Sequence, residues 1–156
     1  MITVLDEREY YYWKPLHFIY DGETVCLRIE EQFLNEELEN IKIGDKSINN
    51  VHKIVSVENS RQYDIIFNNV ALFQVYEELR HIEDDNEIFD KGIIRKYIKS
   101  NLMNFIENNT TFKIEMPENY YKNLKHYCVK TSTDWFDIIA LSDPIIKIVF
   151  RKNKEK

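Results

Sequence analysis

Residues 15–29 read PLHFIYDGETVCLRI, two β-rich runs on either side of an Asp-Gly pair. Asp21-Gly22 favours a two-residue hairpin turn, because both central positions of such a turn need positive φ. A turn of this length fixes the pairing, so we expect Phe18 to face Val25 across the two strands. The stretch therefore predicts an antiparallel hairpin near the start of the chain.

Several further runs of alternating or β-branched residues predict strands. They are residues 51–57, 63–76 (broken by a turn or a bulge at Asn68-Asn69), 111–116, 126–130 and 135–141. The polar residues 30–40 are predicted to form a short helix or a loop, and residues 78–90 are predicted to form a loop that ends at Phe89.

Two helices are predicted from their first residues. Ser100 is a good helix N-cap. We therefore expect a strand over residues 93–98 and, after Ser100, a helix with an apolar stripe at Leu102, Phe105 and Ile106. Ser142-Asp143-Pro144 is predicted to start a last short helix, with Pro144 at its first position and Ile145, Ile146, Val149 and Phe150 on one face. The fold class is therefore α+β, a single domain (1–156) of mostly antiparallel β-sheet with two or three short helices.

Length and composition agree with one globular domain: 156 residues, 44% hydrophobic and 31% charged. No apolar run approaches the roughly 18 to 20 residues of a membrane helix. Acidic Asp6, Glu7 and Glu9 occupy the place where a secretory signal has its apolar region. We therefore expect a cytoplasmic protein without a membrane partner.

The net charge of −6 is unevenly distributed, since residues 1–90 hold 20 acidic and 8 basic side chains, whereas residues 91–156 hold 7 and 13. Acidic residues crowd two windows, which we predict to form a contact surface. These residues are Glu30, Glu31, Glu36, Glu37 and Glu39, and then Glu77, Glu78, Glu83, Asp84, Asp85 and Glu87. Such a surface repels nucleic acid and attracts basic proteins. The alternative is a solvated face that only keeps the domain soluble.

An aromatic run at Tyr10, Tyr11, Tyr12 and Trp13 is a second candidate contact. Tyr and Trp offer a large contact area with a polar group, which is typical of interaction hot spots, although core packing or a sheet edge explains the run equally well.

Motifs for catalysis or for cofactor binding are missing from the sequence. It has no G-x-S-x-G, and its three glycines are isolated, which excludes a phosphate-binding loop. One metal arrangement is conceivable: His126 and Cys128 share a strand face, and His17 with Cys26 shares a hairpin face, so four ligands for zinc are present if the two faces meet. Free cysteines in strands are more often small buried hydrophobes. We predict no metal and no cofactor.

Three blocks carry a family resemblance: YDIIFNNVALFQVYEE (residues 63–78), KSNLMNFI (99–106) and HYCVKTSTDWFDIIALSDPII (126–146). Together they resemble small bacterial proteins of the immunity type, which are encoded beside polymorphic or contact-dependent toxin genes. The blocks cover about half of the chain and contain no catalytic signature, so no functional residue carries over. The resemblance implies a cytoplasmic protein that binds and inactivates a cognate toxin domain, commonly a nuclease.

The residues and the resemblance together predict a toxin-neutralising immunity protein, not an enzyme, that acts on a basic partner by electrostatic and strand-edge contacts. Its oligomeric state, monomer or homodimer, is left open. Two other readings stay open: a metal-dependent or hydrolytic enzyme built on His126, Cys128 and Asp137, and a phage- or plasmid-derived interaction module without a toxin partner.

Overall fold

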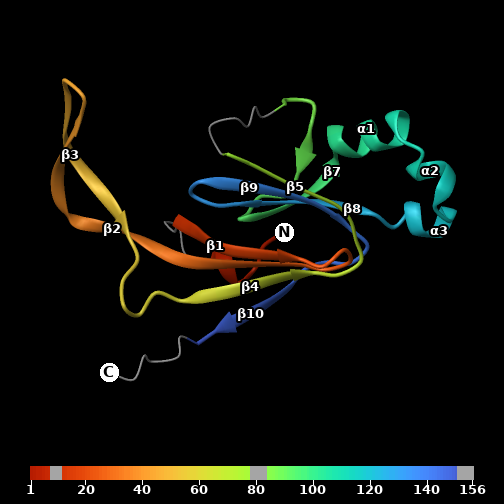
Figure 1. The fold of residues 1–156 in the computed structure, drawn as a ribbon, viewed down its shortest axis with the longest axis horizontal. Coiled ribbons are helices and arrows are strands. Elements are labelled where there is room, and N and C mark those ends of the chain that lie inside the picture. Colours follow the sequence, from red (N-terminus) through yellow and green to blue (C-terminus); the bar gives the residue numbers. More distant parts are fainter. Residues whose placement is uncertain (8–11, 78–83, 151–156) are drawn as a thin grey trace.

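Two antiparallel β-sheets packed face to face form the body of the protein (Figure 1). The structure is a computed structural model that describes residues 1–7, 12–77 and 84–150. The first sheet contains, in spatial order, β1 (Tyr12–Tyr20), β2 (Val25–Ile43), β4 (Gln62–Phe67) and β10 (Ile145–Val149), with β3 (Lys46–Val55) paired to β2. The second sheet contains, in spatial order, β5 (Val70–Glu77), β9 (Asp134–Ala140), β8 (Lys125–Lys130), β7 (Ile94–Lys99) and β6 (Ile88–Phe89).

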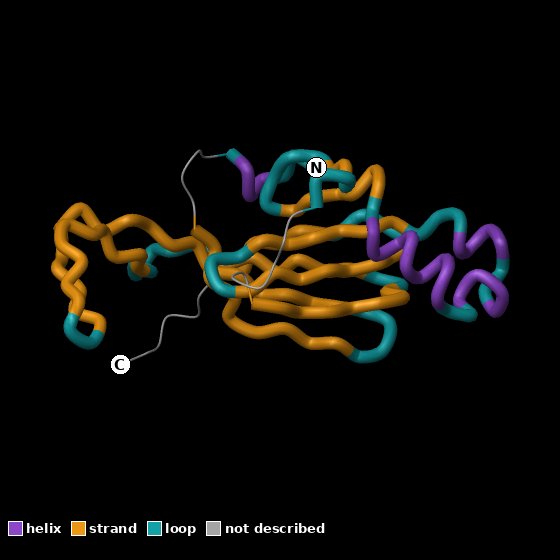
Figure 2. The backbone as a smooth tube through the Cα atoms, turned by 90° about the horizontal axis from the view of Figure 1, so that it is seen from above, coloured by secondary structure: helices purple, strands orange, loops and turns teal. Residues whose placement is uncertain are grey.

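The helices are short and follow β7 in the chain. They are α1 (Asn101–Asn109), α2 (Phe112–Glu115) and α3 (Glu118–Tyr121), and a 3-10 turn, η1 (Val4–Asp6), precedes β1. Figure 2 shows the three α-helices gathered at one end of the molecule. The predicted α+β class with mostly antiparallel sheet is therefore confirmed. No helix within the described ranges is both long enough and apolar enough to cross a bilayer.

The core lies between the two sheets and follows the period-two alternation of their strands. Its buried residues include Trp13, Val25, Leu27, Ile29, Tyr63, Ile65 and Phe67 from the first sheet, and Ile94, Tyr127, Val129, Phe136, Ile138 and Ala140 from the second. Because side chains alternate along each strand, the neighbours of these residues point away from the core. The outward residues of the body strands are therefore where a polar site can form.

The hairpin at Asp21-Gly22 forms, but the predicted register is wrong. Tyr20 pairs with Val25, so the loop has four residues instead of two. The reason lies in Asp21, whose Oδ1 accepts hydrogen bonds from the backbone N–H groups of Glu23 (3.0 Å) and Thr24 (2.7 Å) and so closes a wider turn. The pairing is displaced by two residues, which leaves each side chain on its predicted face.

Three predicted elements are of the wrong type. Residues 30–40 belong to β2, because β3, which comes later in the chain, supplies a partner for this polar stretch. Residues 145–149 form a strand, since this β-branched run pairs with the edge of β4. Residues 112–115 form α2, where the backbone N–H groups of Ile114 and Glu115 both donate to the carbonyl of Thr111.

The boundary at Ser100 is confirmed: β7 ends before it, and its Oγ accepts a hydrogen bond from Met103 N (3.0 Å) at the start of α1. Asn68-Asn69 connects β4 in the first sheet to β5 in the second, with Asn69 at φ +53°. Of the loop predicted over residues 78–90, positions 78–83 lie outside the described residues, and positions 88–89 form β6.

Candidate functional site

A two-stranded β-arm, formed by residues 33–43 of β2 and by β3, projects from the body at the end opposite to the α-helices (Figures 1 and 2). With 19 residues at about 3.3 Å each, β2 is about 60 Å long measured along the curved strand, whereas β4 has only six residues. The outer part of β2 therefore extends past the body and pairs with β3. Exposed large apolar side chains of the arm are Leu34, Leu38, Ile41, Ile43, Ile48 and Ile54. Two-stranded ribbons are marginally stable in water, so an arm with this surface is a candidate contact element.

Local chemistry shapes the arm. Gly44, at φ +59°, closes the turn between β2 and β3, a conformation that favours glycine. A bulge in β3 is accommodated by Asn50, also at φ +59°, whose backbone N–H donates to Asn40 Oδ1 (3.2 Å). Near the base, His52 Nδ1 lies 2.7 Å from the carbonyl oxygen of Asn35. These polar contacts fix the shape of the arm although it has no core of its own.

The first acidic window is divided between the arm and the body. Glu36 and Glu37 are exposed and Glu39 is half-buried, and all three lie on the arm. Glu30 and Glu31 are instead buried at 6% and 2% exposure, so the prediction that they lie on an open acidic surface is wrong. The physical reason is that both carboxylates pair with side chains at the start of β4.

Glu31 forms an ion pair with Arg61, whose Nη2 lies 2.8 Å from Oε1, and the backbone N–H of Arg61 donates to Oε2 (3.3 Å). Glu30 Oε1 accepts a hydrogen bond from Gln62 Nε2 (2.8 Å). Both carboxylates are thus satisfied within the fold, next to the point where the arm leaves the body. These contacts attach the base of the arm to the body, and the two buried carboxylates do not form part of the contact surface.

The second acidic window lies around β5 and β6, at the second sheet. Glu77 and Asp85 are exposed, whereas Glu78 and Glu83 lie outside the described residues. Asp84 accepts hydrogen bonds from Asn86 N (2.8 Å) and Asn101 Nδ2 (2.7 Å), and these bonds, led by the one from Asn86 N, hold its pKa below the usual value. Glu87 is half-buried and accepts from Asn101 N (2.8 Å) at the start of α1. Two members of this window therefore stabilise a helix terminus.

The aromatic run does not form one exposed cluster. Trp13 is 3% exposed and packs edge-on against Tyr63, with ring centroids 5.5 Å apart, so it is a core residue and not a surface contact. Tyr12 is exposed. Tyr10 and Tyr11 lie outside the described residues.

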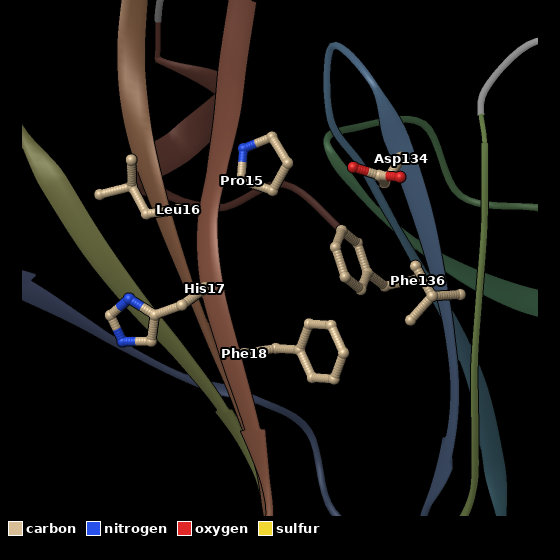
Figure 3. A pocket seen from close by; sticks show the side chains of 7 residues that line it. Pro15, Leu16, His17, Phe18, Asp134 and Phe136 are labelled. Carbon is tan, nitrogen blue, oxygen red and sulfur yellow. The ribbon is translucent and has the colours of Figure 1, made fainter.

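A groove of about 370 Å3 opens where the edge strands of the two sheets, β1 and β5, approach each other. It is lined by Pro15, Leu16, His17, Phe18, Val75, Asp134 and Phe136. Figure 3 shows Phe18 and Phe136 pointing toward each other across the gap, with Leu16 and His17 on the other side of β1. The ring centroids of Phe18 and Phe136 lie 6.0 Å apart, so aromatic packing closes the sandwich at the edge formed by β1 and β5.

A buried polar network lies on the outer side of the second sheet. His126 Nδ1 is 2.7 Å from Ser100 Oγ, and His126 Nε2 is 3.2 Å from Asp137 Oδ1, although the angle falls short of a hydrogen bond. Gln74 Nε2 donates to Asp137 Oδ2 (2.9 Å). Burial alone raises the pKa of Asp137, but the contacts with His126 and Gln74 outweigh it and hold the pKa below its usual value.

Sequence reasoning singled out His126, Cys128 and Asp137 as the basis of an enzyme, and the pairing of β8 with β9 does bring them together. It missed Ser100, whose role in the network depends on the pairing of strands far apart in the chain. Ser100 also caps α1, and Ser100, His126 and Asp137 are all buried. Burial raises the pKa of the Cys128 thiol well above its usual range, which disfavours a reactive thiolate. These contacts join the start of α1 to β8 and β9.

The conceivable zinc site is contradicted by the fold. Cys26 alternates with core residues of the first sheet and Cys128 with core residues of the second, so they point away from the shared core on opposite sides. Within residues 1–7, 12–77 and 84–150, no three His, Cys, Asp or Glu side chains are grouped so that they can hold a metal ion.

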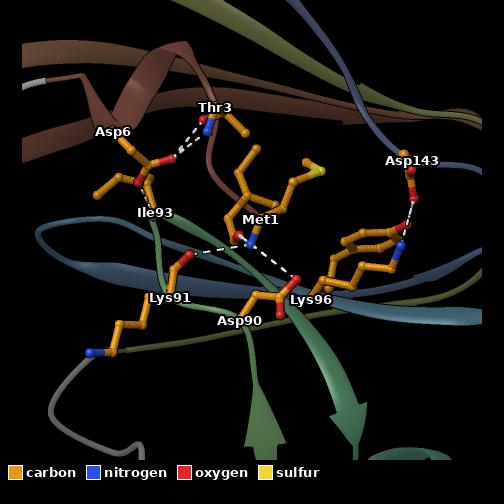
Figure 4. A network of polar contacts seen from close by, with 10 residues as sticks. Met1, Thr3, Asp6, Asp90, Lys91, Ile93, Lys96 and Asp143 are labelled. Carbon is orange, nitrogen blue, oxygen red and sulfur yellow. Dashed lines mark hydrogen bonds and ion pairs between the residues drawn. The ribbon is translucent and has the colours of Figure 1, made fainter.

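Polar contacts also tie the first residues to the second sheet (Figure 4). The Met1 amino group donates to the carbonyls of Lys91 and Ile94, both at 3.3 Å, and Asp6 Oδ1 accepts from Ile93 N (2.7 Å). Before β10, Asp143 accepts from the Tyr127 hydroxyl and from Lys125 Nζ (3.1 Å), and these contacts lower its pKa to about 2. This network is structural, because it secures two segments that flank the sandwich.

No protein-family model matches this chain, and neither a curated protein nor a solved structure shows significant similarity to it.

Proposed function

We propose that this chain is an immunity-type binding protein that neutralises a cognate toxin domain in the cytoplasm by covering it. The proposed activity makes and breaks no covalent bond. The observation that supports it best is the β-arm, which projects from the body and exposes apolar side chains together with acidic ones. An element of this kind provides contact area that the body of the protein does not use.

Electrostatics favours a basic partner. Glu36 and Glu37 are exposed on the arm, and the first 90 residues carry 20 acidic against 8 basic side chains. Complementary charge speeds the encounter of two proteins and selects against partners of the wrong sign. A toxin domain that binds nucleic acid has a basic surface and is therefore the partner class that fits.

Main-chain pairing is a second proposed contact. On the arm, β3 pairs with β2 along one edge, and no strand of the described residues pairs with its other edge. An extended segment of the partner can add to such an edge by backbone hydrogen bonds, with specificity supplied by side chains on alternate positions.

The test is co-expression with the product of the neighbouring open reading frame, followed by a growth assay and by binding kinetics at several salt concentrations. Neutralisation of the toxin and a salt-dependent association rate are expected. Glu36→Lys with Glu37→Lys should slow association about tenfold or more and weaken its salt dependence. A chain that neither binds that neighbouring product nor rescues growth contradicts the proposal.

A matched control comes from the opposite end of the molecule. Glu115→Lys with Glu118→Lys, in α2 and α3, makes the same change in net charge on exposed positions away from the arm. This pair should leave the association rate within about twofold. Equal slowing by both pairs would show that only net charge matters and that the arm is not the contact.

A further inference from the structure

Near the tip of the arm, over residues 39–43 of β2 and 46–51 of β3, which we call the outer arm, the exposed isoleucines lie on one face. Register pairs Ile41 with Ile48 and Glu39 with Val51, and Ile43 pairs with Lys46 at the tip. Directly opposed residues share a face, as do residues two apart in a strand. Ile41, Ile43, Ile48 and Val51 therefore form one surface, which we name the isoleucine face.

The isoleucine face is open to solvent. Ile43 is 63% exposed, Ile48 is 49% exposed and Ile41 is 43% exposed. Over the same residues the opposite face carries Lys42 and Ser47, whereas nearer the base it carries Leu34, Leu38 and Ile54, which are 43%, 55% and 38% exposed. The outer arm therefore has the pattern of a sheet that packs on one side against another surface.

Charge identifies the surface that fits. Along the isoleucine face, Glu39 lies toward the base of the arm and Lys46 lies at the tip. When two identical arms pack face to face and antiparallel, the tip of one lies beside the base of the other. Glu39 of one copy then meets Lys46 of its partner, and the two-fold axis repeats the contact. The face is thus complementary to itself.

We infer that two copies of this chain associate through antiparallel packing of their isoleucine faces, with reciprocal Glu39–Lys46 ion pairs at the two ends. The outer arm has only five residues of β2 and six of β3, so the contact is small and the dimer is weak and concentration-dependent. The inference concerns the protein alone and stands whether or not the proposed toxin partner is correct.

The experiment is sedimentation velocity of the purified full chain, from micromolar to millimolar concentration. The wild-type protein should shift from monomer to dimer. Glu39→Lys alone and Lys46→Glu alone should each weaken the dimer about tenfold, because symmetry turns two attractive pairs into two repulsive ones. An equimolar mixture of the two variants should restore association, since in the mixed dimer both pairs are again attractive.

Lys42→Glu is the matched control, because it reverses a charge near the tip on the face opposite to the isoleucine face and should leave the dimer within about twofold. Circular dichroism of every variant checks that the arm strands are retained. A wild-type chain that stays monomeric at millimolar concentration overturns the inference. So does a mixture that associates no more tightly than either variant alone, or a control variant as weak as Glu39→Lys.

Discussion

The ion pair between Glu31 and Arg61 allows a quantitative test of how the arm is attached to the body. The Glu31 side chain is 3% exposed, whereas that of Arg61 is 37% exposed. Removal of one partner from a buried pair is strongly destabilising, since it leaves an uncompensated charge. Arg61→Leu should therefore destabilise the protein more than Glu31→Gln, after which the partly exposed arginine can regain water.

The magnitude follows from the geometry. Breaking a buried pair costs about 3 to 5 kcal/mol, and the lower end applies here because the backbone N–H of Arg61 still donates to Glu31 after the substitution. At about 2 to 4 °C per kcal/mol for a chain of this size, a loss of about 3 kcal/mol lowers Tm by about 6 to 12 °C.

The double variant Glu31→Leu with Arg61→Leu supplies the decisive comparison. It removes the buried charge together with its partner, so it should be more stable than Arg61→Leu alone by at least about 1 kcal/mol. Urea unfolding of the wild type, the two leucine single variants and the double variant gives the coupling energy directly. Additive losses would refute the reasoning, because they would mean that Glu31 does not depend on Arg61.

Two further predictions test the structural networks. Gly92→Ala should destabilise the protein by about 1 to 3 kcal/mol in urea unfolding, because Gly92 has φ +136° and an added Cβ lies 2.8 Å from the Met1 carbonyl oxygen; an unchanged midpoint would contradict this packing. Asp143→Asn should destabilise the protein near neutral pH, and the difference should shrink as the pH falls from about 4 toward 2, since a pKa lowered to about 2 from 3.8 gives stability that is present above the unfolded pKa and is lost on protonation. Parallel stability curves for the wild type and Asp143→Asn over that pH range would rule out this role for the carboxylate.

Local signals in the sequence predicted local features well. Ser100 marks the start of α1, because an N-cap needs only its own side chain and a backbone N–H three residues later. The β-rich runs 126–130 and 135–141 likewise predicted β8 and β9. Features that depend on distant partners were missed: β2 continues through residues 30–40 because β3 pairs with it, and residues 145–149 form a strand because β4 offers an edge.

The candidate site shows the same limit. Glu31 and Glu37 each have a glutamate as a neighbour in the sequence, and nothing local distinguishes them. Arg61, 30 positions further along the chain, makes Glu31 a buried structural residue, while Glu37 stays exposed on the arm. The buried network at His126 was predicted only in part, since its contact with Ser100 depends on which strands lie beside each other.

The place where the core ends explains why the arm exists in this form. Val25, Leu27 and Ile29 alternate into the core, and the next two residues, Glu30 and Glu31, contact the side chains of Gln62 and Arg61 at the start of β4. Beyond this point β2 no longer faces the second sheet, so its apolar residues gain no burial from the body. Ordering a strand of more than ten residues costs conformational entropy, and contact with another surface offsets that cost when the body does not. The isoleucine face and the exposed glutamates therefore point to association, and the mixing and charge-reversal experiments separate a second copy from a basic partner.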